Sequence, residues 1–364
     1  MRQPSLIEAM TAAEVPDLPP RAWEDLLSQA RRSLLIGRWA CRLADRGQLD
    51  RVPEGPRRHL ASAMTVADRV QVEMRLEADR VQRALQRAGV RCVLLKGAAY
   101  LCGRLPAARG RVFGDIDILV PRDALARVEG TLLGGGWVAG AVDAYDQRYY
   151  REWMHELPPL THIHGDSTID VHHTITAPTS AFRVDGQRLL AAARPVDAEG
   201  RFWVLQPVDM VLHSAVHLFQ EGEFDHGLRD LLDMAELLRH FESAEPGFWP
   251  ALFARARELR LERPLHHALF HIERLLGPRV PPAWRSAQDA LRPPWLQHRL
   301  MAWLLGVALR PRHPSTTLPL EPLALWLLYL RSHWLRMPLH LLLPHLARKA
   351  WRRRIAAAGD TAKA

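Results

Sequence analysis

The sequence predicts an α+β fold, in which a small mixed-sheet core lies between an N-terminal helical segment and a C-terminal all-helical domain. Residues 115–120 alternate acidic with branched apolar side chains, a pattern typical of a half-buried strand. Residues 90–95 form a short apolar run that leads into helix-forming residues, and helical composition dominates on both sides of this region. The expected divisions are residues 1–88, 89–205 and 206–358, followed by a disordered tail at 359–364.

The composition indicates an ordinary globular protein with a basic surface. The 364 residues carry a net charge of +9, almost wholly from arginine, which is compatible with nucleotide, nucleic-acid or anionic-lipid partners. The three cysteines, Cys41, Cys92 and Cys102, lack the spacing of a disulfide framework or a zinc knuckle. The first 20 residues have no apolar signal core, and no run of about 18 uncharged apolar residues occurs. We therefore expect a cytoplasmic protein without a transmembrane segment.

Two helices are expected before the core, and neither carries obvious chemistry. The first covers Trp23 to Ala44 and the second Ala61 to Ala88, separated by the breaker Pro53-Glu54-Gly55-Pro56. In the second helix, apolar residues recur near helical spacing, which predicts a packing role. These residues are Val66, Val70, Met74, Val81 and Leu85.

Two carboxylates on the central strand predict a metal site. Asp115 and Asp117 are two residues apart, so their side chains point to one face of the strand. Carboxylates this close repel each other unless a cation lies between them, and Mg²⁺ prefers such oxygen ligands. Asp117→Asn is therefore expected to keep or improve the stability of the metal-free protein, because it removes a like-charge contact. The alternative is a structural network in which Arg109 and Arg111 pair with the acids.

The residues before this strand favour a phosphate site. Lys96 is the only lysine before Arg348, in a chain that otherwise uses arginine, and a compact ammonium suits phosphate. Gly97 follows at a predicted strand–turn–helix junction, where free backbone N–H groups attract anions and glycine allows close approach. After residue 120 the pattern predicts a helix from Pro121 to Leu133, ended by three glycines, and then another strand.

A β-hairpin is expected at residues 161–172, with Asp170 and His172 on the same face of its second strand. The hairpin and its surroundings are rich in histidine, which allows a second interpretation as a zinc or iron site. The candidate ligands are His155, His162, His164, His172, His173 and Asp170. Strand register decides this question, since a three-residue loop places His162 on the face of Asp170, whereas a two-residue loop sends His162 and His164 to the other face.

The sequence resembles the uncharacterised bacterial nucleotidyltransferase family within the DNA polymerase β-like superfamily. The resemblance rests on Leu-Lys-Gly, then Arg111-x-x-x-Asp115-Ile-Asp117, then Ile169-Asp170-Val171, and it extends from about Ala84 to Thr174. One departure is Gly97-Ala98, where the wider superfamily has Gly-Ser, so the hydroxyl that commonly touches the triphosphate is missing.

The resemblance implies transfer of a nucleoside monophosphate from an NTP to an acceptor, with Mg²⁺ or Mn²⁺ as the cofactor. Asp115, Asp117 and Asp170 would be the catalytic acids and would hold two metal ions. The nucleotide would contact Lys96, Gly97, Ala98, Arg109, Arg111, His213, His217 and Asp230. The acceptor stays open among small molecules, sugars, peptides, proteins and RNA ends. For His217 and Asp230, the alternative is a buried polar pair that ties two helices together.

Other functions are also compatible with the sequence. The fold could act as a non-catalytic nucleotide- or nucleic-acid-binding regulatory module, and a His-rich metal hydrolase is a third possibility. Near the C-terminus, residues 318–346 are very apolar and are followed by the basic cluster of residues 348–354. Proline interruptions favour a helical core with a solvated basic tail, and weak peripheral contact with an anionic membrane is the alternative.

A helical connector precedes the C-terminal domain. Residues 177–201 are expected to link the two parts, with a short helix at Gln187 to Ala193, and a longer helix begins at Pro207. On that helix Asp209, His213 and His217 share one stripe by the i, i+4 rule.

Overall fold

The computed structural model describes residues 4–140, 153–164, 167–222, 224–338 and 340–342. Within these ranges, no helix has the length and apolar character needed to cross a membrane. The predicted disordered tail and the basic cluster at residues 348–354 lie outside the described residues.

The N-terminal segment is helical, as predicted, but its boundaries differ. The helices are α1 (Leu6–Thr11), α2 (Pro20–Arg32), α3 (Ile36–Asp45) and α4 (Glu54–Arg87), with a 3₁₀ turn η1 (Leu49–Arg51) before α4. The single helix expected from Trp23 to Ala44 is wrong. Leu34 adopts a left-handed φ of 53°, and the N–H of Leu35 donates to the carbonyl of Ala30, a geometry that ends α2.

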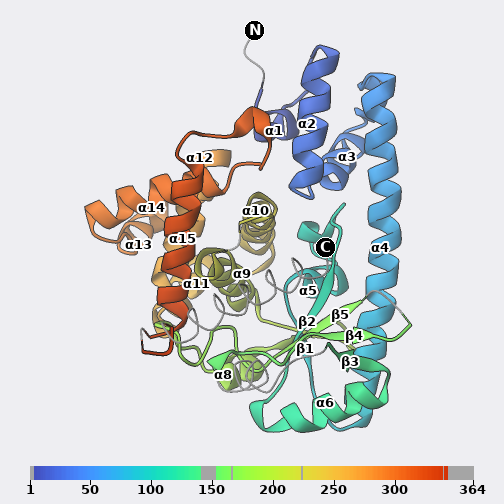
Figure 1. Cartoon of the computed structure of the whole chain (residues 1–364), viewed down its shortest axis with the longest axis vertical. Helices are drawn as coiled ribbons and strands as arrows, with labels where there is room; N and C mark the ends of the chain where they lie inside the picture. Colours follow the sequence, from blue (N-terminus) through green and yellow to red (C-terminus); the bar gives the residue numbers. More distant parts are fainter. Residues whose placement is uncertain (1–3, 141–152, 165–166, 223, 339, 343–364) are drawn as a thin grey trace, which may run out of the picture.

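Helix α4 corresponds to the second predicted helix, but it begins at Glu54, seven residues before the predicted start at Ala61, and is the longest helix in the described residues. Pro56 does not break it, because proline is tolerated in the first helical turn, where its missing N–H has no partner to lose. The 34 residues of α4 run along one side of the whole molecule (Figure 1). Met74, Val81 and Leu85 are buried as expected, whereas Val66 is half exposed.

The core is one seven-stranded mixed sheet, in the order β3-β4-β5-β2-β1-β7-β6. The strands are β1 (Val93–Leu94), β2 (Asp115–Leu119), β3 (Trp137–Ala139), β4 (Leu160–His162), β5 (Thr168–His172), β6 (Arg194–Pro195) and β7 (Trp203–Val204). The short helices beside them are α5 (Lys96–Cys102), η2 (Pro106–Ala108), η3 (Arg122–Ala124), α6 (Leu125–Gly134) and α8 (Gly186–Ala192). The predicted order of strand, helix, strand, helix, strand is confirmed from β1 to β3. The connector carries the predicted short helix and also strand β6, and β7 follows it directly; the sequence pattern indicated neither strand.

Register places the three acids together. Strands β2 and β5 are parallel neighbours, with Asp117 directly beside Asp170 and Ile116 beside Ile169. The isoleucines are fully buried on one face, so the acids lie on the opposite face. The predicted hairpin is confirmed, since β4 and β5 are antiparallel, with Leu160 opposite Ile169.

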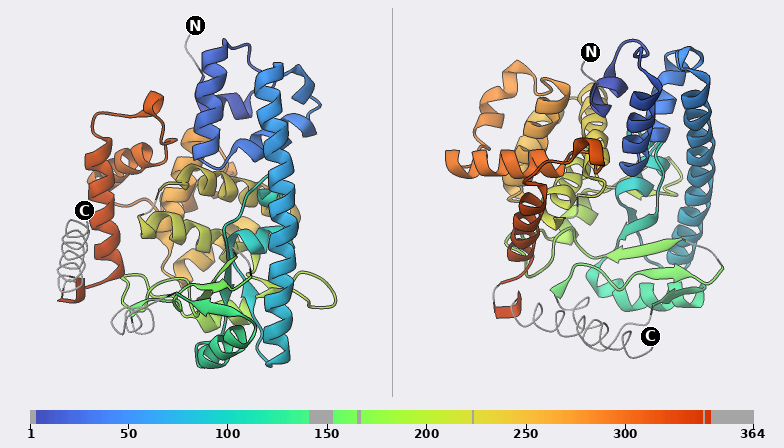
Figure 2. Two further views of the ribbon diagram at one scale, coloured as in Figure 1. Left: turned by 45° about the vertical axis from the view of Figure 1, so that its right-hand side comes forward. Right: turned by 45° about the horizontal axis from the view of Figure 1, so that its top comes forward.

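The C-terminal part is helical in the described residues. It contains α9 (Pro207–Glu221), α10 (Gly227–Ala244), α11 (Phe248–Glu258), α12 (Glu262–Leu276), α13 (Arg285–Asp289), α14 (Trp295–Ala308) and α15 (Glu321–Arg336), with 3₁₀ turns η5 (Pro282–Trp284) and η6 (Pro314–Thr316). Helix α9 starts at Pro207 as predicted. Helices α14 and α15 lie on the side of the molecule away from α4 (Figures 1 and 2).

One large hydrophobic core joins α4, the sheet and the C-terminal helices in the described residues. It extends from Met74 on α4, through the sheet, to Leu328 on α15. A second cluster joins helices α1 to α4 to Leu228 and Leu232 of α10. The N-terminal helices are thus packed on the C-terminal part as well as on the sheet, and the division into three domains stays a prediction.

Candidate active site

Three carboxylates converge on one face of the sheet. Asp115 and Asp117 come from β2 and Asp170 from β5, and each offers an oxygen such that all three oxygens lie within 4.8 Å of one another. The cause is the parallel register, because adjacent strands are separated by only about 5 Å. This separation agrees with the expectation that Asp117 and Asp170 can share a metal ion.

Asp117 is buried between two positively charged groups. Its Oδ1 lies 2.8 Å from Lys96 Nζ and 3.0 Å from His172 Nε2. Burial by itself would raise the pKa of Asp117, but Lys96 and His172 hold this pKa well below its usual range. Burial also disfavours charge on His172, yet its hydrogen bond with Asp117 raises its pKa above the ordinary value. The contact therefore favours the ionised form of Asp117 and the positively charged form of His172.

The pKa values of the other two acids, Asp115 and Asp170, are raised instead of lowered. The neighbouring charge of Asp117 raises the pKa of Asp115. Burial, followed by the charge of Asp117, raises the pKa of Asp170 to about 7. Oδ1 of Asp170 is buried and has no hydrogen-bond partner among the described residues.

This set of donors fits a hard divalent cation. All three candidate ligands are carboxylate oxygens, which such cations prefer. A nearby positive charge would stabilise the ionised forms of Asp115 and Asp170, whose pKa values are raised. A cation would also give Oδ1 of Asp170 the partner that it lacks among the described residues. Asp115, Asp117 and Asp170 are the residues that would hold Mg²⁺ or Mn²⁺.

Lys96 is positioned by a strained turn at the end of β1. The N–H of Leu95 donates to the carbonyl of Asp117 at 2.9 Å, which ties this turn to β2. Lys96 itself has a φ of 43°, a left-handed conformation that costs a non-glycine residue free energy and is often found at functional sites. The turn keeps the ammonium group beside Asp117.

Gly97 has a packing role that the sequence analysis did not foresee. A Cβ at this position would lie 2.4 Å from the ring of Phe113 and 3.2 Å from Nη1 of Arg111. The space above Gly97 is thus filled by Phe113, and a phosphate can approach this backbone only if the ring moves. Ala98, the neighbouring candidate, is 1% exposed and belongs to the hydrophobic core.

Helices α9 and α10 close the face that carries the acids. Between them and the sheet lies a pocket of about 80 Å³, lined by Lys96, Asp115, Asp117, His217 and Asp230, among others. His217 of α9 lines this pocket together with Asp115 of the sheet and Asp230 of α10. His213 is buried one turn earlier, and burial, followed by Lys96, holds its pKa well below the ordinary value. Asp209, on the same stripe, is fully buried and pairs with Arg255 at 2.7 Å, outside this pocket.

The two arginines of the loop before β2 have different surroundings. Arg111 is buried, pairs with Asp233 at 3.2 Å and Asp230 at 3.7 Å, and lies over the rings of Tyr100 and Phe113. Arg109 instead pairs with Asp45 of α3 at 2.7 Å and is exposed. Arg111 therefore belongs to the wall of the pocket, and Arg109 does not. Arg109 forms its ion pair with Asp45, and Arg111 forms its ion pairs with Asp230 and Asp233, so these contacts differ from the alternative network with Asp115 and Asp117.

Other polar residues complete the pocket wall. Tyr100 and Ser214 share a hydrogen bond of 2.6 Å, and Arg229 pairs with Asp230 at 2.8 Å. Arg38 of α3 pairs with Asp233 and donates to the carbonyl of Ala107. The only signal in the sequence for this cluster is the spacing of Arg229, Asp230 and Asp233 on one helix. Arg38 and Asp233 are 195 positions apart in the chain, so no local sequence pattern could indicate their contact.

The histidine-rich interpretation is supported only in part. Nδ1 of His172 lies 3.5 Å from Glu156, and these two residues form a potential metal-binding group with His155. His162 pairs in register with Trp137 and lies near Ser167, on the face opposite Asp170. Among the described residues, His162, His164 and His173 join no such group.

Comparison with known proteins identifies the family of this chain. A family model described as uncharacterised nucleotidyltransferase matches residues 19–277, which is well over half of the chain. No curated protein matches the chain. Nor does any solved structure. The matched range contains the three acids, Lys96 and the helices that cover them. The chain belongs to this family of uncharacterised nucleotidyltransferases.

Proposed function

We propose that the protein transfers a nucleoside monophosphate from an NTP to an acceptor and that it is a member of the DNA polymerase β-like superfamily. The observation that carries this proposal is the convergence of Asp115, Asp117 and Asp170, whose oxygens lie within 4.8 Å of one another, beside the ammonium of Lys96. In this reaction an acceptor atom bonds to the α-phosphorus, the bond to the β-phosphate oxygen breaks, and pyrophosphate leaves.

The three acids would hold Mg²⁺ or Mn²⁺, which when bound neutralises triphosphate charge and lowers the pKa of an attacking hydroxyl. Lys96 would stabilise negative charge that develops on the phosphate, since a nearby ammonium in a water-poor site stabilises a transition state more than it does in water. His172 keeps Asp117 ionised and fixes its orientation through the hydrogen bond of 3.0 Å. Arg111, His213, His217 and Asp230 would line the path to the nucleotide.

The nucleotide needs more space than the pocket of about 80 Å³ provides, because small-molecule sites usually measure about 300–1,000 Å³. Phe113 is the side chain whose movement opens this space, since its ring covers Gly97. We therefore infer that NTP binding displaces Phe113 from Gly97.

Pyrophosphate release tests the proposal. The purified protein is incubated with Mg²⁺, each of the four NTPs and a panel of small-molecule, peptide, protein and RNA acceptors, and mass spectrometry detects the added nucleotide. Asp115→Asn and Asp170→Asn should each reduce transfer at least about 100-fold, because metal-ion catalysis contributes several kcal/mol. Asp123→Asn is the matched control, as this exposed aspartate in η3 lies outside the site.

The alternative is a regulatory module that binds nucleotide without turnover. It predicts NTP binding, seen by calorimetry, without release of pyrophosphate for any acceptor in the panel. Unchanged transfer in Asp170→Asn would contradict the metal-dependent mechanism itself.

A further inference from the structure

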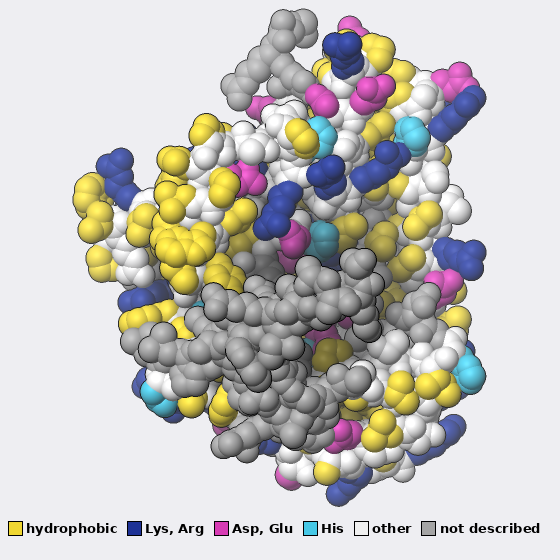
Figure 3. Space-filling model, in the orientation of Figure 1, with side chains coloured by type: hydrophobic (Ala, Val, Ile, Leu, Met, Phe, Trp, Pro, Cys, Tyr) yellow, Lys and Arg dark blue, Asp and Glu magenta, His cyan; other side chains and the backbone are white. Residues whose placement is uncertain are grey.

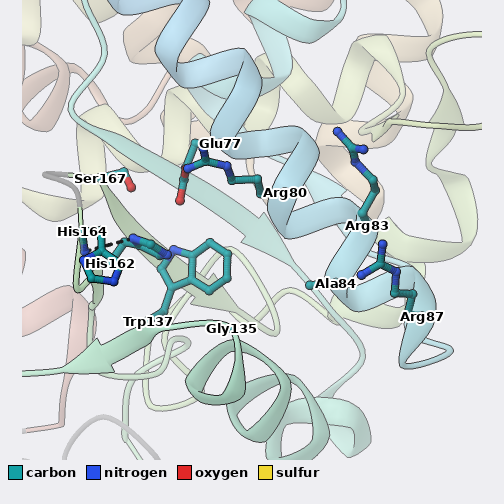
Figure 4. Close-up of a pocket in the computed structure, with 10 residues that line it drawn as sticks. All are labelled: Glu77, Arg80, Arg83, Ala84, Arg87, Gly135, Trp137, His162, His164 and Ser167. Atoms are coloured by element: carbon teal, nitrogen blue, oxygen red, sulfur yellow. Dashed lines mark hydrogen bonds and ion pairs between the residues drawn. The ribbon is translucent and has the colours of Figure 1, made fainter.

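A second cavity lies between α4 and the edge of the sheet. It measures about 640 Å³, within the usual range for small-molecule sites. Arg80, Arg83 and Arg87 line it from α4, and Trp137 and His162 from β3 and β4 (Figure 4). No residue of this cavity lines the pocket beside the three acids.

Strand register shows that this cavity lies on the opposite face of the sheet from Asp170. Trp137 is paired with His162, so both side chains point to the same face, and Leu160, two residues before His162, is paired with Ile169. Asp170 follows Ile169 and points the other way. The cavity and the proposed active site are therefore separated by the strand that carries Asp170.

The α4 wall is strongly basic. Residues 80, 83 and 87 recur at the spacing of one helical face, which spreads three guanidinium groups over about 10 Å. Arg80 pairs with Glu77 at 3.0 Å and Arg83 pairs with Asp79, but both arginine side chains stay about 60% exposed. Guanidinium groups in this arrangement favour a ligand with several phosphate oxygens, because each can donate two parallel hydrogen bonds.

Two buried polar atoms on the wall have no hydrogen-bond partner among the described residues. They are Nε1 of Trp137 and Oε1 of Glu77, and these side chains are only 3% and 7% exposed. A buried polar atom without a partner destabilises the fold, so a ligand that supplies the missing partner is favoured. The indole N–H is a further donor for an anion, and the glutamate oxygen accepts from a hydroxyl or amino group. The ring of Trp137 is fixed by an edge contact with His162, at 4.9 Å between centroids.

We propose that this cavity binds a small phosphorylated molecule, with two or more phosphate groups and a hydroxyl or amino group, at a site distinct from the three acids. Arg80, Arg83, Arg87 and Trp137 bind the phosphates, and Glu77 binds the hydroxyl or amino group. This inference goes beyond nucleotide transfer and does not depend on it.

Calorimetric titration with inorganic tripolyphosphate in EDTA tests the site. The double variant Arg80→Gln/Arg87→Gln should bind the probe at least about tenfold more weakly than the wild type, because two charge-assisted contacts are lost. Arg69→Gln is the matched control: it removes an exposed arginine of the same helix that pairs with Glu73, outside the cavity, and should leave the affinity within about twofold. Lys96→Met, which affects the proposed active site, should leave this binding event in place.

Protection of the wild-type protein provides a second measurement that does not depend on the folding of a variant. Phenylglyoxal modification of Arg80 and Arg87, followed by peptide mass spectrometry, should slow severalfold with tripolyphosphate, whereas modification of Arg69 should not change. The proposal is overturned if the double variant binds like the wild type, if Arg69→Gln weakens binding equally, or if Lys96→Met removes all binding.

Discussion

Asp115 and Asp117 are two residues apart on one strand, but their surroundings give the two carboxylates opposite electrostatics. Asp117 is 2% exposed and lies between Lys96 and His172, whereas Asp115 is exposed at the start of β2 and its pKa is raised by Asp117. Lys96 and His172 thus stabilise the charge of Asp117, whereas the charge of Asp115 is still disfavoured by the negative charge of Asp117. The expectation that Asp117→Asn keeps or improves stability assumed that no other charge relieves the repulsion between the two carboxylates, and the contacts with Lys96 and His172 remove that assumption.

We predict opposite effects of the two substitutions on the metal-free protein. Asp117→Asn leaves the partly buried Lys96 and the buried His172 without their carboxylate and should lower the free energy of unfolding by about 3 kcal/mol. Asp115→Asn removes a like charge and should keep or raise this free energy. Urea denaturation in EDTA measures both, and nucleotide transfer should be lost in both. Equal losses of stability in the two variants would contradict this assignment of charges.

Asp170 gives the stability a specific pH dependence. Its pKa is about 7 in the folded protein against an ordinary value of 3.8, so between these values the folded state binds more protons than the unfolded chain. The contribution of Asp170 to the free energy of unfolding therefore falls as pH rises from about 4 to about 7. Asp170→Asn removes this contribution.

The stability advantage of Asp170→Asn over the wild type should accordingly grow from pH 4.5 to pH 7 and level off above it. Urea denaturation in EDTA at several pH values gives this difference, and the use of a difference cancels the titration of groups that both proteins share. A difference independent of pH would show that the pKa of Asp170 is not raised.

At the scale of elements, the loop between α5 and β2 is held against the N-terminal helices. Gly110 has a φ of 67°, and a Cβ there would lie 2.5 Å from the carbonyl oxygen of Gly37 in α3. Arg38 donates to the carbonyl of Ala107 in the same loop, at 2.6 Å. This contact positions Arg111 and Phe113, so the N-terminal helices support the pocket without contributing a candidate catalytic group.

Gly110→Ala should therefore lower the free energy of unfolding by at least about 2 kcal/mol, since it adds left-handed strain and a clash with backbone that cannot rotate away. Gly114→Ala is the control in the same loop, because its φ is not positive and no atom lies within 4 Å of its added Cβ. Urea denaturation compares the two variants. If Gly114→Ala lowered the free energy of unfolding as much as Gly110→Ala does, the contact between Gly110 and α3 would not contribute to stability.

At the scale of the whole molecule, the face formed by α14 and α15 is unusually apolar. Apolar side chains gather on this part of the surface (Figure 3). Trp295, Trp303, Trp326 and Trp334 are each at least 39% exposed, and Glu321 is the only acidic residue of the two helices. Tryptophan beside arginine is typical of the interface between a membrane and water, so the alternative of weak peripheral contact with anionic lipid has a defined candidate surface.

We predict that the protein sediments with vesicles of phosphatidylglycerol more than with vesicles of phosphatidylcholine. Trp326→Ser/Trp334→Ser should reduce the bound fraction severalfold, because both indole rings would enter the interface. Leu76→Ser is the control, since this residue of α4 is 56% exposed on another side of the molecule. Binding that is equal for both lipids, or unchanged in the double variant, would leave the face without a role at membranes.

The sequence by itself determined the local features of this protein. Alternation predicts β2 and the shared face of Asp115 and Asp117. Glycine and proline mark several helix ends, and the apolar run that ends at Lys96-Gly97 predicts the turn after β1. Such features depend on residues close together in the chain, whose spacing follows strand and helix geometry directly. The family match over residues 19–277 agrees with the resemblance drawn from these motifs.

Only the tertiary structure decided which charges meet. The parallel register puts Asp170 beside Asp117, and His172 also contacts Asp117. Packing places Phe113 over Gly97 and pairs Arg38 with Asp233. It also pairs Arg109 with Asp45 and buries Ala98 in the core. Strand pairing and helix packing join residues far apart in the chain, and a register shift by one residue would reverse the face of every side chain. The electrostatics of a buried site depends on distances of a few ångströms across such contacts, and for that reason residue spacing in the sequence could predict the acids but not their pKa values.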